Sequence, residues 1–122
     1  MHELSIALSI VEGVEEEIAR RQGAHVYTVH LKLGPLSGVV KDALLFSYEV
    51  ACEGTPLEGS KLEIEEIPVV LYCLRCRREQ PAVSIQRLCC AVCDTPSADI
   101  RRGSELEVFA LELSDERATA AG

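Results

Sequence analysis

Four of the six cysteines in this 122-residue chain form two Cys-x2-Cys pairs. Cys73 is paired with Cys76 and Cys90 with Cys93, and 13 residues separate the two pairs. Two thiolates on one tight turn can bind one metal ion, and two such turns complete a tetrahedron of sulfur ligands. Zn²⁺ takes this geometry in structural sites. The spacing therefore predicts a closed zinc site that has no open position for a substrate.

Other interpretations of these cysteines stay open at this point. Cys89 precedes Cys90, so a Cys89-x3-Cys93 spacing is also possible. We favour Cys90 because it repeats the spacing of the first pair. The thiols could instead serve redox chemistry or form disulfides. However, the chain shows no secretory signal and no apolar run long enough to span a membrane, so we expect a cytoplasmic protein, where disulfides are rare.

The charge of the cysteine-rich segment raises a further alternative, a zinc ribbon that binds nucleic acid or acts as an interaction module. Residues 73–103 contain six arginines and three acidic residues, a net charge of +3. The whole chain carries a formal net charge of −8, so the remainder carries −11. An acidic body disfavours nucleic-acid binding, which relies on a basic surface. We also find no nucleophile–base pair and no phosphate-binding loop, so we do not expect an enzyme.

The first three residues, Met1, His2 and Glu3, form a second candidate metal site. The bulky His2 is expected to hinder removal of Met1. The α-amine, the His2 amide and the His2 imidazole could then chelate one ion, with an amide or carboxylate of Glu3 as fourth ligand. Nitrogen-rich planar sets of this kind suit Ni(II) and Cu(II). Taken alone, the pattern is more typical of a solvated terminus in which Glu3 stabilises a helix start.

The spacing of apolar residues predicts the elements that position these sites. Helical spacing predicts helices at residues 3–22 and 39–53, and alternation of apolar and polar residues predicts strands at 25–33, 61–71 and 104–113. The apolar stripe of the first helix comprises Leu4, Ala7, Leu8, Val11, Val14 and Ile18.

Several local features complete this prediction. Ser37, in the turn-forming sequence GPLSG, is predicted to cap the second helix. The first strand is expected to be half-buried, with Tyr27, Val29, Leu31 and Leu33 on one face and Thr28, His30 and Lys32 on the other. In the 61–71 strand the alternation slips at Glu65 and Glu66, which indicates a bulge or bend.

These elements predict an α+β fold: a small mixed β-sheet with two helices packed on it, plus an inserted zinc-binding module. The first two strands should be parallel because a helix connects them, and the second and last strands should pair antiparallel. Residues 1–71 and 104–113 would form the body, residues 72–103 the zinc-binding insert, and residues 114–122 a loose tail.

The combination of these features resembles the HypA/HybF family of hydrogenase nickel-incorporation proteins. The resemblance rests on MHE at the start, the amphipathic helix, LKLGPLSGV, and the segment from GSKLEIEEIPVV through both cysteine pairs, and it extends to about Leu113. Two features depart from the family pattern. Ala91 stands where proline is common, and Cys89 adds a thiol beside the motif.

The resemblance implies a nickel metallochaperone that carries Ni(II) and Zn(II). Nickel would bind at Met1, His2 and Glu3, and a structural zinc at Cys73, Cys76, Cys90 and Cys93. The implied partners are a nickel-binding GTPase of hydrogenase maturation and the [NiFe]-hydrogenase large subunit, and in some organisms the urease accessory proteins. Neither nucleic acid nor a membrane is an expected partner, and the chain is expected to be a monomer or a weak homodimer.

Overall fold

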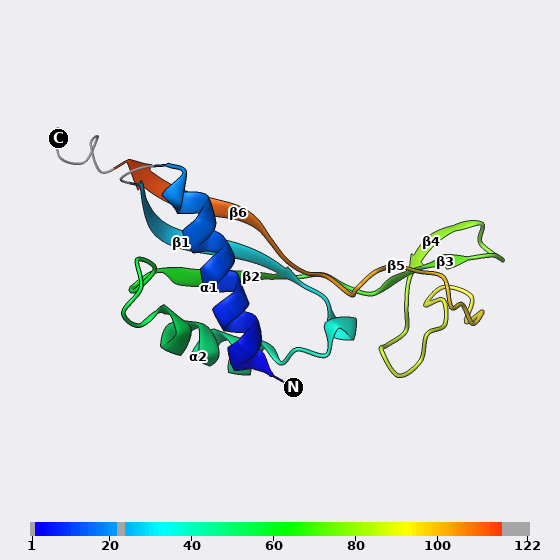
Figure 1. Cartoon of the computed structure of the whole chain (residues 1–122). Helices are drawn as coiled ribbons and strands as arrows, with labels where there is room; N and C mark the ends of the chain where they lie inside the picture. Colours follow the sequence, from blue (N-terminus) through cyan, green and yellow to red (C-terminus); the bar gives the residue numbers. More distant parts are fainter. Residues whose placement is uncertain (1, 22–23, 116–122) are drawn as a thin grey trace. The chain divides into compact units, whose positions relative to one another are not determined.

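The computed structural model describes residues 2–21 and 24–115 of the chain (Figure 1). Its elements, in chain order, are α1 (Glu3–Ala19), β1 (Ala24–Leu33), the short 3-10 helix η1 (Pro35–Ser37), α2 (Lys41–Cys52), β2 (Lys61–Glu66), β3 (Val70–Cys73), β4 (Arg78–Pro81), β5 (Ile100–Arg102) and β6 (Leu106–Asp115). Within the described residues, no helix is long and apolar enough to cross a membrane.

β1 is the central strand of a three-stranded sheet with the order β2-β1-β6 (Figure 1). The amide of Ile67, just after β2, donates to the carbonyl of Leu33 at the end of β1, so these two strands end together and run parallel. The amide of Gly34 donates to the carbonyl of Glu105, just before β6, so β6 runs antiparallel to β1. The predicted mixed sheet is confirmed. The predicted pairing of the second and last strands is wrong, because β1, the more deeply buried strand, lies between them.

Both helices contribute to the core of this sheet, and α1 lies across its strands (Figure 1). α1 buries Ala7, Val11 and Val14, which recur at helical spacing and so share one face. Leu4 and Leu8, expected on the same stripe, are about half exposed at 47% and 49%. Ile6 and Ile10 pack against the core instead, so the buried face of α1 is rotated from the predicted stripe. On α2 the buried residues are Leu44, Tyr48, Ala51 and Cys52.

Two local predictions fail for reasons visible in the backbone. Ser37 ends η1 and does not cap α2, which begins after Val40 without a side-chain cap. The alternation of buried residues along β1 is interrupted where Thr28 and Val29 are both buried, and Tyr27 is 52% exposed. A strict two-residue period cannot anticipate such an interruption.

The predicted strand at residues 61–71 is two strands that belong to different sheets. β2 ends at Glu66, at the predicted irregularity, and β3 begins at Val70. Pro68 lies between them and has no backbone N–H to continue a ladder. β3 is the middle strand of a second three-stranded sheet, in the order β4-β3-β5, and pairs antiparallel with both neighbours.

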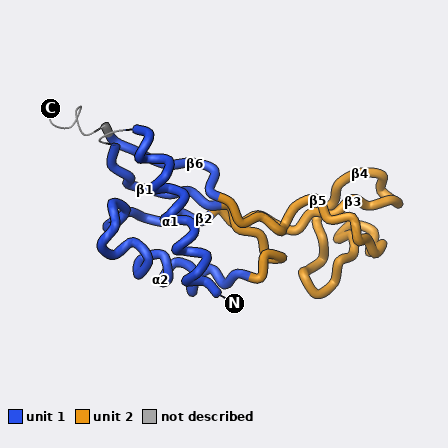
Figure 2. Tube along the Cα trace, viewed as in Figure 1, with its two compact units in different colours: residues 1–31, 39–64, 108–122 blue, residues 32–38, 65–107 orange. Residues whose placement is uncertain are grey.

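The chain divides into two compact units (Figure 2). Unit 1 comprises residues 1–31, 39–64 and 108–122, and unit 2 comprises residues 32–38 and 65–107. Unit 2 thus contains the GPLSG turn as well as the cysteine-rich segment. Of the expected tail, Ser114 and Asp115 belong to β6, and residues 116–122 lie outside the described part of the chain.

Two glycines allow a close backbone crossing inside unit 2. A Cβ atom on Gly34 would lie 2.1 Å from the carbonyl oxygen of Gly103, and that oxygen accepts a hydrogen bond of 2.7 Å from the amide of Leu36. Gly103 has φ of +119°, and a Cβ atom there would lie 2.9 Å from Val69. The GPLSG turn is therefore held against the segment that returns from the cysteine-rich region.

Candidate metal centre

The motif cysteines lie on two matching turns of unit 2. In each turn a backbone amide closes on the carbonyl four residues earlier, from Arg77 to Cys73 and from Asp94 to Cys90, both at 2.7 Å. The residue after the second cysteine adopts a left-handed conformation in both turns, with φ of 57° at Arg77 and 63° at Asp94. Each turn thereby reverses the chain immediately after its second cysteine.

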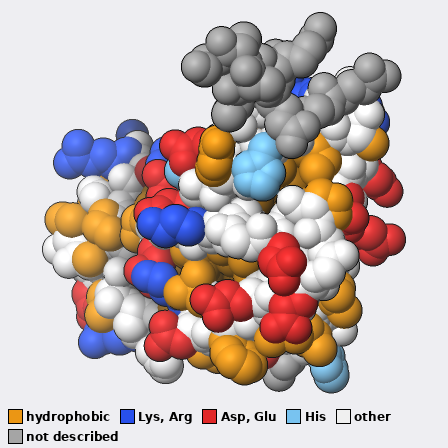
Figure 3. Space-filling view, turned by 90° about the vertical axis from the view of Figure 1, so that its left-hand side faces the viewer, with side chains coloured by type: hydrophobic (Ala, Val, Ile, Leu, Met, Phe, Trp, Pro, Cys, Tyr) orange, Lys and Arg blue, Asp and Glu red, His pale blue; other side chains and the backbone are white. Residues whose placement is uncertain are grey.

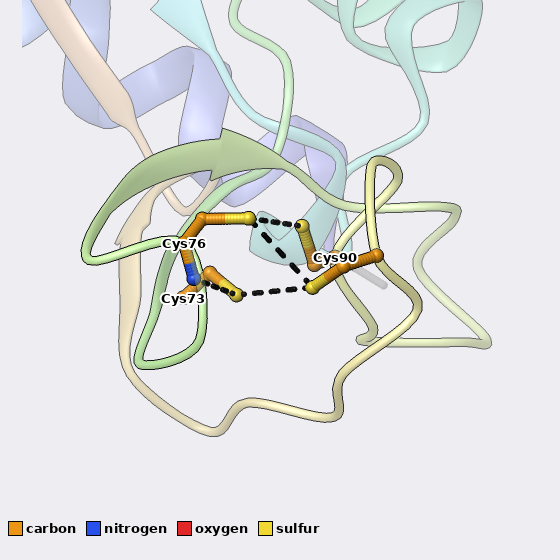
Figure 4. Close-up of side chains that lie close together, drawn as sticks. Cys73, Cys76 and Cys90 are labelled. Atoms are coloured by element: carbon orange, nitrogen blue, oxygen red, sulfur yellow. Dashed lines mark hydrogen bonds between the residues drawn. The ribbon is translucent and has the colours of Figure 1, made fainter.

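The two turns bring the four sulfur atoms together, and each lies within 4.8 Å of the other three (Figure 4). The Sγ atom of Cys76 is 3.9 Å from that of Cys90 and 3.7 Å from that of Cys93, and the Cys73 and Cys93 sulfurs are 3.5 Å apart. A tetrahedron with metal–sulfur bonds of about 2.3 Å has edges of about 3.8 Å. The measured separations fit one ion held by four thiolates.

The four cysteine side chains differ in burial, and two of the sulfurs accept hydrogen bonds from backbone amides. The side chains of Cys73 and Cys90 are fully buried, whereas those of Cys76 and Cys93 are partly buried. The amide of Cys76 donates to the Cys73 sulfur at 3.3 Å, and the amide of Val92 donates to the Cys90 sulfur at 3.4 Å. Donors of this kind orient metal-binding sulfurs and reduce their negative charge.

In the protein without metal, the thiols differ strongly in acidity. Burial and hydrogen bonds to the neighbouring thiols raise the pKa of Cys76 to about 12. Hydrogen bonds from Thr95, first its hydroxyl and then its amide, lower the pKa of Cys93 to about 6. Crowded thiols cannot all ionise without a cation, so binding of a divalent ion must release protons. Thr95 was not among the predicted site residues, and its only signal in the sequence is its position two residues after the last motif cysteine.

The remaining cysteines lie outside the cluster. The cluster contains Cys90 and not Cys89. Cys89 takes part in a short backbone pairing with Pro96, and Cys52 is buried beside Tyr48 on α2. Within the described residues, no other group of three or more histidine, cysteine or acidic side chains lies close enough to hold a metal ion.

Ion pairs hold the loops around the cysteine turns. Arg87 binds both carboxylate oxygens of Asp94, next to Cys93, and Arg101 binds Asp99 at 2.9 Å. The Arg101 guanidinium holds the pKa of the Asp99 carboxyl below its ordinary value.

The second candidate site is described only in part, because Met1 lies outside the described residues. His2 is exposed and forms the N-cap of α1, where its carbonyl accepts the amide of Ile6 at 3.1 Å. A carboxylate oxygen of Glu3 accepts the amide of Val40 at 3.1 Å, which links the start of α1 to the start of α2. This hydrogen bond holds the pKa of the Glu3 carboxyl below its ordinary value. The sequence carried no signal for this contact.

The chain was compared with known families, proteins and structures. Residues 1–113 match the family model described as hydrogenase/urease nickel incorporation, metallochaperone, hypA. A hydrogenase maturation factor HypA from Roseiflexus sp. (strain RS-1) is 48% identical over 116 residues, covering 95% of this chain and 94% of that protein. A hydrogenase maturation factor HypA from Chloroflexus aurantiacus is 46% identical over 112 residues, covering 92% of this chain and 98% of that protein.

Solved structures give the same fold. The solution structure of the Ni metallochaperone HypA from Helicobacter pylori aligns with a TM-score of 0.65 at 24% identity, covering 93% of this chain and 97% of that one. A second HypA solution structure aligns with a TM-score of 0.68, also at 24% identity, covering 95% and 98%. The family match over nearly the whole length, together with the identity to curated relatives, shows that this chain belongs to the HypA family of nickel-incorporation metallochaperones for hydrogenase maturation.

Proposed function

We propose that this protein binds one Ni(II) ion at its amino terminus and one Zn(II) ion at its four clustered cysteines, and that it delivers the nickel to a [NiFe]-hydrogenase. The observation that carries the proposal is the family match over residues 1–113, which includes both motifs. The sulfur tetrahedron supports the zinc assignment.

The zinc site suits a structural role. Cys73, Cys76, Cys90 and Cys93 would hold the ion as thiolates, and four such ligands leave no position for a substrate. A bound zinc ion supplies the positive charge that lets all four thiols ionise. The chain itself holds the sulfurs in place through the two turns. The small hydrophobic cluster around them buries only Leu71, Cys73 and Cys90. Metal binding would therefore stabilise unit 2.

The nickel site suits a carrier because His2, one of its proposed ligands, is exposed. The α-amine of Met1, the amide and imidazole of His2, and an amide or carboxylate oxygen of Glu3 would surround the ion in the planar arrangement that Ni(II) accepts. The exposed position of His2 leaves room for a receiving protein to approach. In this proposal an ion bound there is passed on, and the protein acts as a carrier rather than as an enzyme.

The receiving proteins follow from the family. We infer that the large subunit of a [NiFe]-hydrogenase accepts the nickel in the cytoplasm and that a nickel-binding GTPase of the maturation pathway cooperates in the transfer. The family description also names urease, so urease maturation is a second candidate pathway. In this proposal the body, residues 1–71 and 104–113, carries nickel, and the insert, residues 72–103, carries zinc.

Titration calorimetry with Ni(II) tests the nickel site. His2→Ala, and separately an extension of the chain before Met1, should weaken nickel binding and leave one zinc per chain by elemental analysis. His25→Ala is the matched control and should bind nickel like the wild type. Unchanged nickel affinity in His2→Ala would refute the terminal site. A pull-down with nickel-loaded protein should then recover the hydrogenase subunit and the GTPase.

A further inference from the structure

β6 has one edge that no other described strand covers. Its neighbour in the sheet is β1, and β6 is the last strand in the order β2-β1-β6. It is ten residues long, as long as β1, whereas the other edge strand, β2, has only six. An open strand edge presents backbone N–H and C=O groups that an additional strand can pair with.

A hollow of about 530 Å³ in unit 1 lies between β6 and the end of α1. Its lining residues are Glu17 and Arg21 from α1, and Val108, Phe109, Ala110, Leu111 and Leu113 from β6. Side chains alternate between the two faces of a strand, so a hollow over one face would touch only every second residue. Four consecutive residues, 108–111, line this one. The hollow therefore reaches the backbone edge of the strand as well as its side chains.

The side chains that β6 contributes to the hollow are apolar and partly open to solvent, and the two from α1, Glu17 and Arg21, form an ion pair. Val108 is 38% exposed and Phe109 is 46% exposed, although Phe109 also contacts the ring of His30. Leu111 and Leu113 are partly buried against the core. A segment placed here would gain backbone hydrogen bonds and would cover apolar surface at alternate positions.

The charge of unit 1 indicates which kind of segment fits. Unit 1 contains thirteen acidic and five basic residues and so carries the whole net charge of −8, whereas unit 2 has seven of each and is neutral. Figure 3 shows acidic side chains scattered over the visible surface, with hydrophobic groups between them. A second copy of this chain would bring another net charge of −8 close to the strand and would be repelled, whereas a basic segment would be attracted.

We propose that β6 and its hollow form a docking site for an extended polypeptide segment of a partner protein, with apolar and basic residues in alternation. The segment adds a fourth strand beside β6. Its apolar residues cover Val108 on one face of the sheet, and its basic residues, on the other face, are attracted by the acidic surface of unit 1. This site uses none of the proposed metal ligands, so it stands or falls independently of the nickel and zinc assignments.

Peptides test the proposal directly. The first probe alternates lysine and valine over about nine residues, which spans β6 at about 3.3 Å per residue. The second replaces lysine by glutamate, and the third is the lysine peptide with methylated backbone nitrogens. Only the first should bind the intact protein, and it should slow hydrogen exchange at amides within residues 108–113. Val108→Lys should weaken binding by about tenfold or more, through lost apolar contact and added like charge.

Val50→Lys on α2 is the matched control, because Val50 is 41% exposed, close to the value for Val108. It should bind the lysine peptide like the wild type. Equal binding of the glutamate or methylated peptide, or no binding of the lysine peptide, would overturn the proposal. A homodimer that Val108→Lys dissociates in sedimentation would also overturn it, because a second copy would then be the occupant.

Discussion

Replacing Gly34 by alanine should destabilise this protein, because the backbone of a second segment occupies the space that a side chain would need. The added Cβ atom would lie 2.1 Å from the carbonyl oxygen of Gly103 and 2.7 Å from the amide nitrogen of Ser104. Both neighbours are backbone atoms, so no side chain can rotate away. The φ angle of Gly34 is −100°, which alanine adopts without strain, so the effect would come from space alone.

The magnitude follows from the contacts at the crossing. Relieving the overlap requires the two segments to separate by about 1 Å, and overpacking of this kind costs about 1–3 kcal/mol. The movement would also weaken a backbone hydrogen bond, either Gly34 to Glu105 at 2.8 Å or Leu36 to Gly103 at 2.7 Å. Such a bond contributes about 1 kcal/mol. The total is about 2–4 kcal/mol, or a melting temperature lower by about 8–16 °C for a chain of this size.

Thermal unfolding followed by circular dichroism, with zinc present in excess, measures this shift. Gly13→Ala is the control, because no atom lies within 4 Å of its added Cβ. Gly13 is inside α1, so that substitution should raise stability by about 0.5–1 kcal/mol. If Gly34→Ala has the same melting temperature as the wild type, or if the melting temperatures of both variants shift in the same direction, the close crossing does not constrain the fold as described.

Three further perturbations test other contacts. Cys73→Ser should abolish stoichiometric zinc binding and loosen unit 2, whereas Cys89→Ser should retain one zinc per chain by elemental analysis. In urea unfolding, Ser60→Ala should lower the free energy of unfolding by about 1–3 kcal/mol and Tyr48→Phe by only about 1 kcal/mol. Ser60→Ala has the larger effect because it leaves the buried Tyr48 hydroxyl without its hydrogen-bond partner at 2.7 Å. In the folded protein the pKa of the Glu3 carboxyl is lowered from its ordinary value of 4.5. The ionised carboxylate therefore stabilises the fold above pH 4.5, and this stability is lost as the pH falls through the lowered pKa. In the metal-free protein, Glu3→Gln should therefore flatten this acid-side loss of stability, and an unchanged pH profile would exclude the contact.

The sequence anticipated those parts of the structure whose cause is local. The two Cys-x2-Cys spacings indicated which four sulfurs would meet, because each spacing defines a short turn whatever the rest of the chain does. Apolar periodicity located both helices and the main strands. It could not show that residues 61–71 divide at Pro68 between two sheets, because strand assignment to a sheet depends on distant partners.

Other features of the fold depend on contacts between residues that are far apart in the chain. Among the described strands, β6 pairs only with β1, although chain order suggested β2 as its neighbour. The carboxylate of Glu3 meets the amide of Val40, 37 residues away, and two glycines separated by 69 positions allow one backbone to cross another. Residue type and short spacing are enough to define possible metal ligands, so those could be named before the fold was known. Only packing determined which surfaces are buried, which edge is free and where a side chain cannot fit.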